Sequence, residues 1–446
     1  MKRSKLNRLK FRDLREVIRG FAVFLVVAVV FALPLIMPPK VGAATQAQIN
    51  TALANGVAWS AAQQQAAGYW LIAPGYSETD QRRTLGTTGL ALAVLGHYAE
   101  HLGKTPLSPD YAYHEHVQKG LNYIFGKAYR NAGDNRVWFG DANITWADNY
   151  SAGPILMGIV MSGAPDRVVD VPGSNVDGMT YGQVVQEIVN YLAYTQCTAG
   201  NGIGAWYYNG LSTTGDLSIT GFVTLGLGYA RDRFNTVVVV QPNMLTQLNQ
   251  GIAFMQWTSD NPADPSYSMV GGAGYSSGSG TTGYENWINI YKVGHLLYIM
   301  DLVGDSAEAA RVLRSLGFLA RHWNAPNSGE SGYDIGTGEW NTKVNDYWDV
   351  GWRGGPPSSP PDPLPSYIAM MATMKGLVAL GVLYVGDQDW FADFSDVIVA
   401  NQDVNGSWRQ GGYPDHYSST LDSQFALLTL LRAAQEDPVV DPDVEN

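Results

Sequence analysis

Cysteine is almost absent from this sequence. Cys197 is the only cysteine in 446 residues, so the chain can form no internal disulfide. A chain of this size without disulfides must be held together by a large core, and a hydrophobic content of 46% allows one. Cys197 lies where a predicted helix meets a loop. We expect it to be a small buried side chain and not a reactive thiol.

Charge is scarce as well. Charged residues make up 15% of the chain, and 40 acidic residues against 28 basic ones give a formal net charge of -12. Beyond the N-terminus the basic residues are scattered, which argues against a nucleic-acid partner. Residues 401–406 begin like a calcium loop, but the twelfth position is Gly412 where such a loop has Glu. We therefore expect no metal and no other cofactor.

Long apolar runs are missing except for one, Phe21 to Met37, which follows a strongly basic N-terminus. This order is typical of an export signal. Val41 and Ala43 are suitably placed for cleavage, so residues 1–44 are predicted to be a signal peptide. An uncleaved signal anchor is the alternative, because the run is just long enough to span a bilayer. Either way the rest of the chain is expected outside the cytoplasm, secreted or at the cell surface, with membrane contact only through this segment.

Strand-like patterns are rare: there is little alternation of apolar and polar residues, and the short run Val237–Val240 is the only strong strand-like segment. Instead, a loop sequence recurs after helix-like segments. Two copies read Q-x-x-x-G-x-W, at Gln64–Trp70 and Gln402–Trp408. Looser copies run from Gln196 to Trp206, from Gln256 through Gly272 to Tyr275, and from Trp323 to Tyr333, and a degenerate one spans Tyr129–Trp138.

Each loop separates two kinds of helix-like segment. The upstream segments are amphipathic, as in Tyr181–Gln196, where Val184, Val185, Ile188 and Leu192 form one stripe. The downstream segments are apolar nearly all round: Thr87–His101, Trp146–Ser162, Asp216–Arg231, Tyr284–Leu302, Ser366–Tyr384 and Tyr417–Gln435. Six such hairpins can close into a ring without capping repeats. We predict an all-α (α/α)6 toroid over residues 45–436, with a long insertion at 324–365 and an acidic tail at 437–446.

The Q-x-x-x-G-x-W repeat resembles that of the squalene and oxidosqualene cyclases and of the protein prenyltransferase β-subunits. The resemblance covers nearly all of the chain after Ala44, and it implies that the repeated Gln and Trp tie each loop to helix ends. The catalytic motifs of that superfamily are absent from this sequence. The sequence has no D-x-D-D acid, no D-D-x-x-D magnesium motif and no D-x-C zinc pair, since Thr195 stands two places before Cys197.

Acidic residues stand at the predicted starts of the inner helices, where the long loops converge. Asp148, Asp216 and Glu285 are the candidate catalytic residues, and for each the alternative is a helix cap. Further candidates for ligand binding lie nearby. They are Tyr284 beside Glu285, Trp348, Asp349, Trp352 and Arg353 in the long insertion, and His416 and Tyr417 before the last helix. For the residues of the long insertion, the alternative is a surface elaboration. For His416, the alternative is a solvated histidine in a turn.

Three functions fit this sequence. The first is a toroid without the superfamily's catalytic motifs that binds an apolar or extended ligand in its central cavity. The second is an extracytoplasmic polysaccharide hydrolase or lyase that uses the acids at the inner helix starts, by analogy with other (α/α)6 rings. The third is a protein-interaction scaffold of a cell envelope. Apolar and glycan ligands both remain open.

Overall fold

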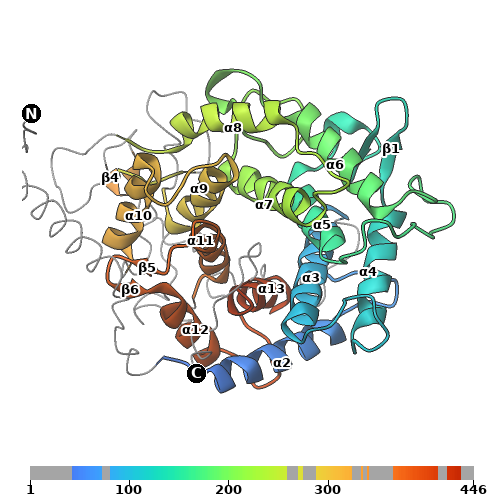
Figure 1. The fold of residues 1–446 in the computed structure, drawn as a ribbon, viewed down its shortest axis with the longest axis horizontal. Coiled ribbons are helices and arrows are strands. Elements are labelled where there is room, and N and C mark those ends of the chain that lie inside the picture. The colour runs from blue at the N-terminus through green and yellow to red at the C-terminus, as the bar shows by residue number, and fades with distance from the viewer. Residues whose placement is uncertain are drawn as a thin grey trace, which may run out of the picture. The chain divides into compact units, whose positions relative to one another are not determined.

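The computed structural model describes residues 43–72, 81–258, 270–274, 288–323, 333–334, 339–340, 365–409 and 419–432. From Ala44 onward these residues belong to one compact unit, Ala44–Asn446. These residues form twelve α-helices that alternate between an outer and an inner position (Figure 1). The outer helices are α2 (Gln46–Ala62), α4 (His114–Gly126), α6 (Tyr181–Thr195), α8 (Pro242–Met255), α10 (Ala310–His322) and α12 (Trp390–Ala400). The inner helices are α3 (Gln81–His101), α5 (Asn149–Val160), α7 (Leu217–Arg233), α9 (Ile290–Leu302), α11 (Tyr367–Ala379) and α13 (Ser419–Leu430).

Each inner helix packs against the next, and α13 packs against α3, so the ring is closed. The predicted (α/α)6 toroid is confirmed. No helix in the described part of the chain is long and apolar enough to cross a membrane. The predicted export segment, apart from residues 43 and 44, and the acidic tail lie outside the described residues.

Two kinds of burial distinguish the two rings of helices. In α6 the predicted stripe Val184, Val185, Ile188 and Leu192 is buried, as expected for a helix with one covered face. The inner helices are buried on all sides and approach one another through glycine. A Cβ added at Gly153 would lie 1.9 Å from the Phe222 carbonyl oxygen, so a larger residue there would push α5 away from α7.

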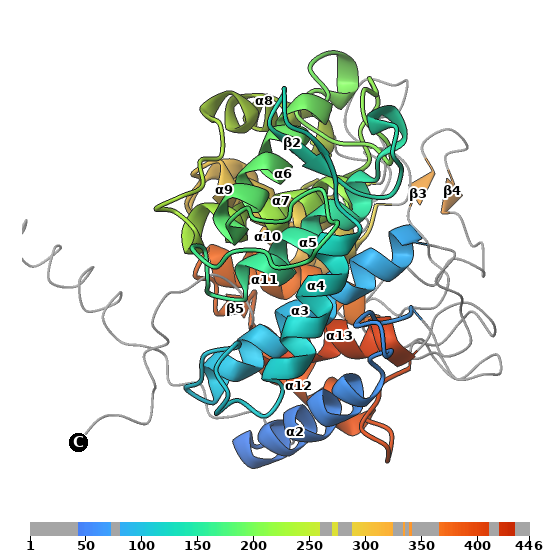
Figure 2. The same ribbon diagram turned by 90° about the vertical axis from the view of Figure 1, so that its right-hand side faces the viewer.

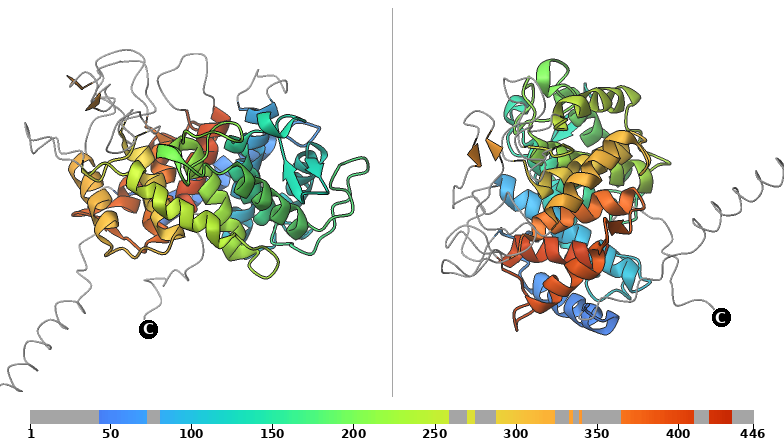
Figure 3. Two further views of the ribbon diagram at one scale, coloured as in Figure 1. Left: turned by 90° about the horizontal axis from the view of Figure 1, so that it is seen from above. Right: turned by 90° about the vertical axis from the view of Figure 1, so that its left-hand side faces the viewer.

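Strands are few and short among the described residues. The antiparallel pairs are β1 (Tyr129–Asn131) with β2 (Arg136–Trp138), β3 (Tyr333–Asp334) with β4 (Glu339–Trp340), and β5 (Tyr384–Val385) with β6 (Gln388–Asp389). The run Val237–Val240 forms no strand and leads into α8. Figures 2 and 3 show β3 and β4 projecting on the side of the ring at which α3 begins, which is the side of the outer-to-inner loops.

The repeated glutamine joins its hairpin to the next one around the ring. The Gln64 side-chain amide donates to the carbonyl of Gly68 in its own loop (2.9 Å) and to that of His116 in α4 (2.9 Å). Gln196 does the same toward Gly204 and toward Met244 in α8 (2.9 and 3.0 Å). Gln402 bonds Gly406 (3.0 Å) and reaches Ala52 in α2 (2.9 Å), so the sixth hairpin is tied to the first.

The repeated tryptophan fastens the loop to the helix that precedes it. Its indole N–H donates to a carbonyl of that helix: Trp70 to Ser60 (2.7 Å), Trp206 to Leu192 (2.9 Å) and Trp408 to Ile398 (2.7 Å). All three indoles are fully buried. Their backbone N–H groups bond a hydroxyl of the following inner helix, from Thr88, Thr220 and Ser423. One residue therefore connects the outer helix, the loop and the inner helix.

The looser copies keep a side-chain hydrogen bond from the loop to the next outer helix, although the groups that form it differ. Gln256 bonds the Arg311 carbonyl (2.6 Å) in α10. The structural glycine of this copy is Gly271 and not the predicted Gly272, because Gly271 has φ +90° and lies against the Arg314 carbonyl. In the fifth copy, Trp323 takes the place of the glutamine and donates to Asp393 of α12 (2.8 Å).

The degenerate second copy uses an ion pair. Arg130 of β1 donates twice to Glu187 of α6, at 2.7 Å each. Glu187 is buried, so this pair occupies the same junction as the glutamine in other hairpins. Cys197 is buried and free of any disulfide, and burial raises the pKa of its thiol to about 11. The expectation of a small buried cysteine is confirmed.

Candidate functional site

A cavity of about 540 Å³ opens among the N-terminal turns of the inner helices. This volume is in the range of cavities that hold small ligands. Its walls come from α3, α5, α7, α11 and α13 and from loops near their starts. The lining residues are mainly apolar or aromatic: Ile72, Arg82, Arg83, Gly86, Thr87, Leu90, Asp148, Tyr150, Pro154, Tyr208, Phe222, Ile368, Leu421 and Phe425.

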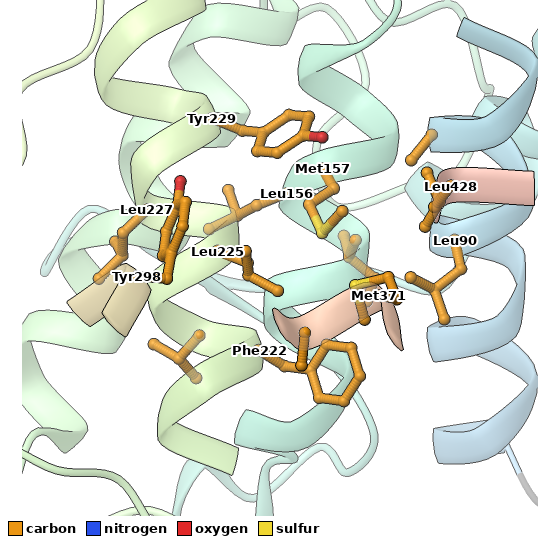
Figure 4. Packing of buried hydrophobic residues seen from close by; sticks show 14 of the residues in the cluster. Leu90, Leu156, Met157, Phe222, Leu225, Leu227, Tyr229, Tyr298, Met371 and Leu428 are labelled. Carbon is orange, nitrogen blue, oxygen red and sulfur yellow. The ribbon is translucent and has the colours of Figure 1, made fainter. Parts of the chain in front are cut away.

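Phe222 crosses the ring beside this cavity. Its ring centroid lies 6.2 Å from that of Phe425 on α13 and 5.4 Å from that of Tyr150 on α5. Since α7 and α13 are not neighbours in the ring, Phe222 closes the space between them. Figure 4 shows Phe222 at one end of the packed interior and Tyr229 at the other, with Leu225 and Met371 among the side chains between them. We refer to the cavity that Phe222 borders as the cup.

The polar groups of the cavity wall are few. Arg82 and Arg83 lie in the first turn of α3, and the Arg82 guanidinium donates to the Trp146 carbonyl (3.1 Å). Two cations at a helix N-terminus are unfavourable, because the helix dipole is positive there. Two adjacent arginines at the start of a predicted inner helix were therefore a signal in the sequence that these side chains have a role in the site. The sequence-based prediction of the site did not include them.

Asp148 is the predicted site residue that the structure places in the cavity wall. It caps α5: one carboxylate oxygen accepts from Tyr150 N–H (3.1 Å), and the other accepts from Ser151 N–H (3.2 Å) and the Ser151 hydroxyl (2.6 Å). Burial raises the pKa of Asp148, while these hydrogen bonds and the nearby Arg82 lower it. The geometry is that of a helix cap, which was the alternative to catalysis.

Asp216 has the same role on α7. It accepts hydrogen bonds from Ser218 N–H (2.8 Å) and Ile219 N–H (3.3 Å), and it is buried. It is not among the cavity-lining residues in the part of the chain that the structure describes. The structure therefore places one predicted catalytic carboxylate, that of Asp148, in the cavity wall, whereas that of Asp216 is buried and does not line the cavity.

The remaining predicted site residues lie outside the described residues: Glu285, Tyr284, Trp348, Asp349, Trp352, Arg353, His416 and Tyr417. The predicted start of the fourth inner helix at Tyr284 is wrong. The helix begins at Ile290, because the Asn289 side chain accepts from Lys292 N–H (2.9 Å) and caps it there. Within the described ranges, no group of His, Cys, Asp or Glu could hold a metal ion.

If Asp148 acts as a helix cap, two substitutions should distinguish the loss of the capping side chain from the loss of its negative charge. Asp148→Ala should lower the free energy of unfolding by about 1–2 kcal/mol, whereas Asp148→Asn should cost less than about 0.5 kcal/mol, because asparagine caps as well as aspartate. Urea unfolding of both variants measures this. An Asn variant as unstable as the Ala variant would show that the carboxylate itself is needed.

A buried polar network lies at the opposite end of the inner ring. Tyr229 of α7 is bonded by His97 of α3 (2.6 Å) and by Lys375 of α11, so three alternate inner helices meet at one hydroxyl. His97 also contacts Glu100 (3.3 Å), and Arg233 bonds the same carboxylate. Burial lowers the pKa of His97 to about 3 and lowers that of Lys375 well below its usual value.

The low pKa of His97 predicts acid sensitivity. The unfolded chain binds a proton at this histidine below about pH 6.5, whereas the folded chain does not until about pH 3, so stability should fall as the pH falls through this window. Between pH 6.5 and 5 the loss from His97 should be roughly 1.5 kcal/mol. Urea unfolding at several pH values measures the slope, and His97→Phe should make it shallower. An unchanged slope in that variant would contradict the assignment.

Comparison with known proteins finds similarity to solved structures and not to known sequences. No family model and no curated protein sequence matches it. A glycoside hydrolase family 76 mannosidase from Bacteroides thetaiotaomicron is similar in structure, with a TM-score of 0.50, 11% identity and coverage of 86% of this chain and 97% of the other. A type II terpene cyclase from Scytonema gives a TM-score of 0.49, 12% identity and coverage of 87% and 99%.

Protein geranylgeranyltransferase-I from Candida albicans, in complex with GGPP, is a third similar structure. Its TM-score is 0.48 at 14% identity, with coverage of 80% of this chain and 86% of the other. The two enzyme groups that the sequence repeats resemble, terpenoid cyclases and protein prenyltransferases, are thus both among the similar structures. At 11% identity, what the chain shares with the mannosidase is its fold, the α/α toroid.

Proposed function

We propose that this chain is an exported protein that binds an elongated, mainly apolar ligand in the central cavity of its ring. The observation that carries the proposal is the cup of about 540 Å³ at the inner helix starts. Its lining combines aliphatic and aromatic side chains with a few polar groups, which is the usual composition of a small-molecule site. The export signal expected at residues 1–44 supports a site of action outside the cytoplasm.

Polysaccharide cleavage is the second candidate, and the described residues support it less. Hydrolysis needs two carboxyl groups that face the same space, one as acid and the other as base or nucleophile. Asp148 faces the cavity, but both its oxygens already accept hydrogen bonds from α5. Its raised pKa is the one observation that favours an acid role.

Purification of the mature protein from its native host, followed by native mass spectrometry, tests the proposal. We expect a non-covalent adduct that organic solvent removes. The emptied protein should bind the neutral apolar probe N-phenyl-1-naphthylamine, whose fluorescence rises in an apolar site. A protein with no adduct and no affinity for the probe would contradict the proposal, and release of sugars from polysaccharides would favour the second candidate.

A further inference from the structure

One wholly buried histidine near the cavity makes no hydrogen bond within the described part of the chain. His295 lies on α9 with an exposed fraction of 0%, and neither its Nδ1 nor its Nε2 has a partner. Buried polar groups are nearly always paired, since leaving one unpaired is costly. Two unpaired nitrogens on one ring therefore call for a group that the described part of the chain does not supply.

The neighbouring helix is shaped to admit this ring. A Cβ added at Gly221 of α7 would lie 2.0 Å from the Cγ of His295, so only glycine leaves room for the imidazole. The ring packs edge to face against Phe222, with centroids 5.3 Å apart, and against Tyr291 at 4.8 Å. Phe222 lines the cavity. His295 is thus separated from the cavity by one aromatic ring.

A second buried histidine shows that the interior can satisfy such a ring. His97 is also buried, yet its Nε2 pairs with the Tyr229 hydroxyl and its Nδ1 contacts Glu100. Both histidines lie on inner helices, and His295 packs against Phe222, which lines the cavity. This contact links the unpaired nitrogens of His295 to the ligand site.

The chemistry of the missing partner follows from the state of the ring. Burial, and then the charge of Lys292, lower the pKa of His295 well below its usual value, so the imidazole is neutral. A neutral imidazole offers one donor and one acceptor. A hydroxyl group can satisfy either nitrogen, and one hydroxyl can both give and accept a hydrogen bond.

We propose that the cavity ligand carries a neutral hydroxyl group that hydrogen-bonds His295, so that His295 selects a long-chain alcohol over the matching hydrocarbon. This proposal rests on the proposed function and names its ligand class. Binding requires the Phe222 ring to turn aside, and side-chain rotamer changes of this kind are common on binding. His295 then anchors the polar end of the ligand while the apolar wall holds its chain.

The test compares 1-dodecanol with dodecane as competitors that displace N-phenyl-1-naphthylamine from the mature protein. The wild type should prefer the alcohol about tenfold, the effect of one net hydrogen bond. His295→Phe should abolish the preference and leave dodecane binding within about twofold, because the ring volume remains. His295→Gln, which keeps a donor and an acceptor, should retain part of the preference.

His97→Phe is the matched control, since it removes another buried imidazole and should leave the preference unchanged. A preference that survives in His295→Phe overturns the proposal, as does a wild type that binds both compounds equally; in that case His295 holds a buried water only. If His295→Phe does not fold, His295→Gln and the wild-type preference decide. A wild type that binds neither compound nor the probe overturns the proposed function itself.

Discussion

A leucine in place of Gly86 should strongly weaken ligand binding and leave the fold intact. Gly86 lies on α3 and lines the cavity, and a Cβ added there would meet only Ser151, at the ordinary distance of 3.5 Å. The leucine side chain would therefore extend into the cup. Removing glycine from a helix also favours the folded state by about 0.5–1 kcal/mol. Most other inner-helix glycines offer no such position, because they touch the backbone of a neighbouring helix.

The measurement is displacement of N-phenyl-1-naphthylamine together with thermal unfolding. We expect the affinity of Gly86→Leu for the probe to fall about tenfold to a hundredfold, since overpacking a filled site costs about 1–3 kcal/mol. Gly86→Ala, which adds a single methyl group, should bind nearly as the wild type does. If the leucine variant folds and binds normally, the ligand site is elsewhere and the central-cavity proposal fails.

The second large effect concerns the closure of the ring at Gly406. This glycine has φ +93°, and a Cβ there would lie 2.5 Å from the Asn55 carbonyl oxygen of α2. Alanine at this position must adopt a strained backbone and also push the sixth hairpin away from the first. We expect Gly406→Ala to lower the free energy of unfolding by about 4 kcal/mol, the sum of the strain and the overpacking.

Gly304 provides the control for backbone strain alone. Its φ of +95° is nearly the same, and a Cβ there would meet nothing within 4 Å. Gly304→Ala should therefore cost only about 1–2 kcal/mol. The difference between the two variants, measured from urea midpoints, isolates the contact between the first and last hairpins. Equal losses in both variants would show that closure at Gly406 adds little to stability.

The ring could be predicted from sequence because its repeats are local. The loop at Gln64–Trp70 and the helices on both sides of it lie within a short stretch of chain, so the pattern shows the hairpin directly. The partners across hairpins could not be predicted. Arg130 with Glu187 and Trp323 with Asp393 replace the glutamine tie with other chemistry, and only the folded ring brings these residues together.

The site was less accessible to sequence reasoning than the fold. Asp148 was found because an acid before an apolar segment is visible in sequence. Phe222 and His295 were missed because the inner helices are apolar on every side, so the sequence does not show which face borders a cavity. Asn289 was missed as a cap, and the start of α9 was therefore placed at Tyr284.

The hydrogen bonds of Gln402 to Gly406 and to Ala52 make the junction between the last and the first hairpin equivalent to the junctions between consecutive hairpins. The sixth hairpin grips the first through the same pair of hydrogen bonds with which Gln64 grips α4, and α13 packs against α2. The ring thus has no structural first hairpin. A circular permutant that joins the end of α13 to the start of α2, and is opened at the surface turn between α9 and α10, would retain every inter-hairpin tie.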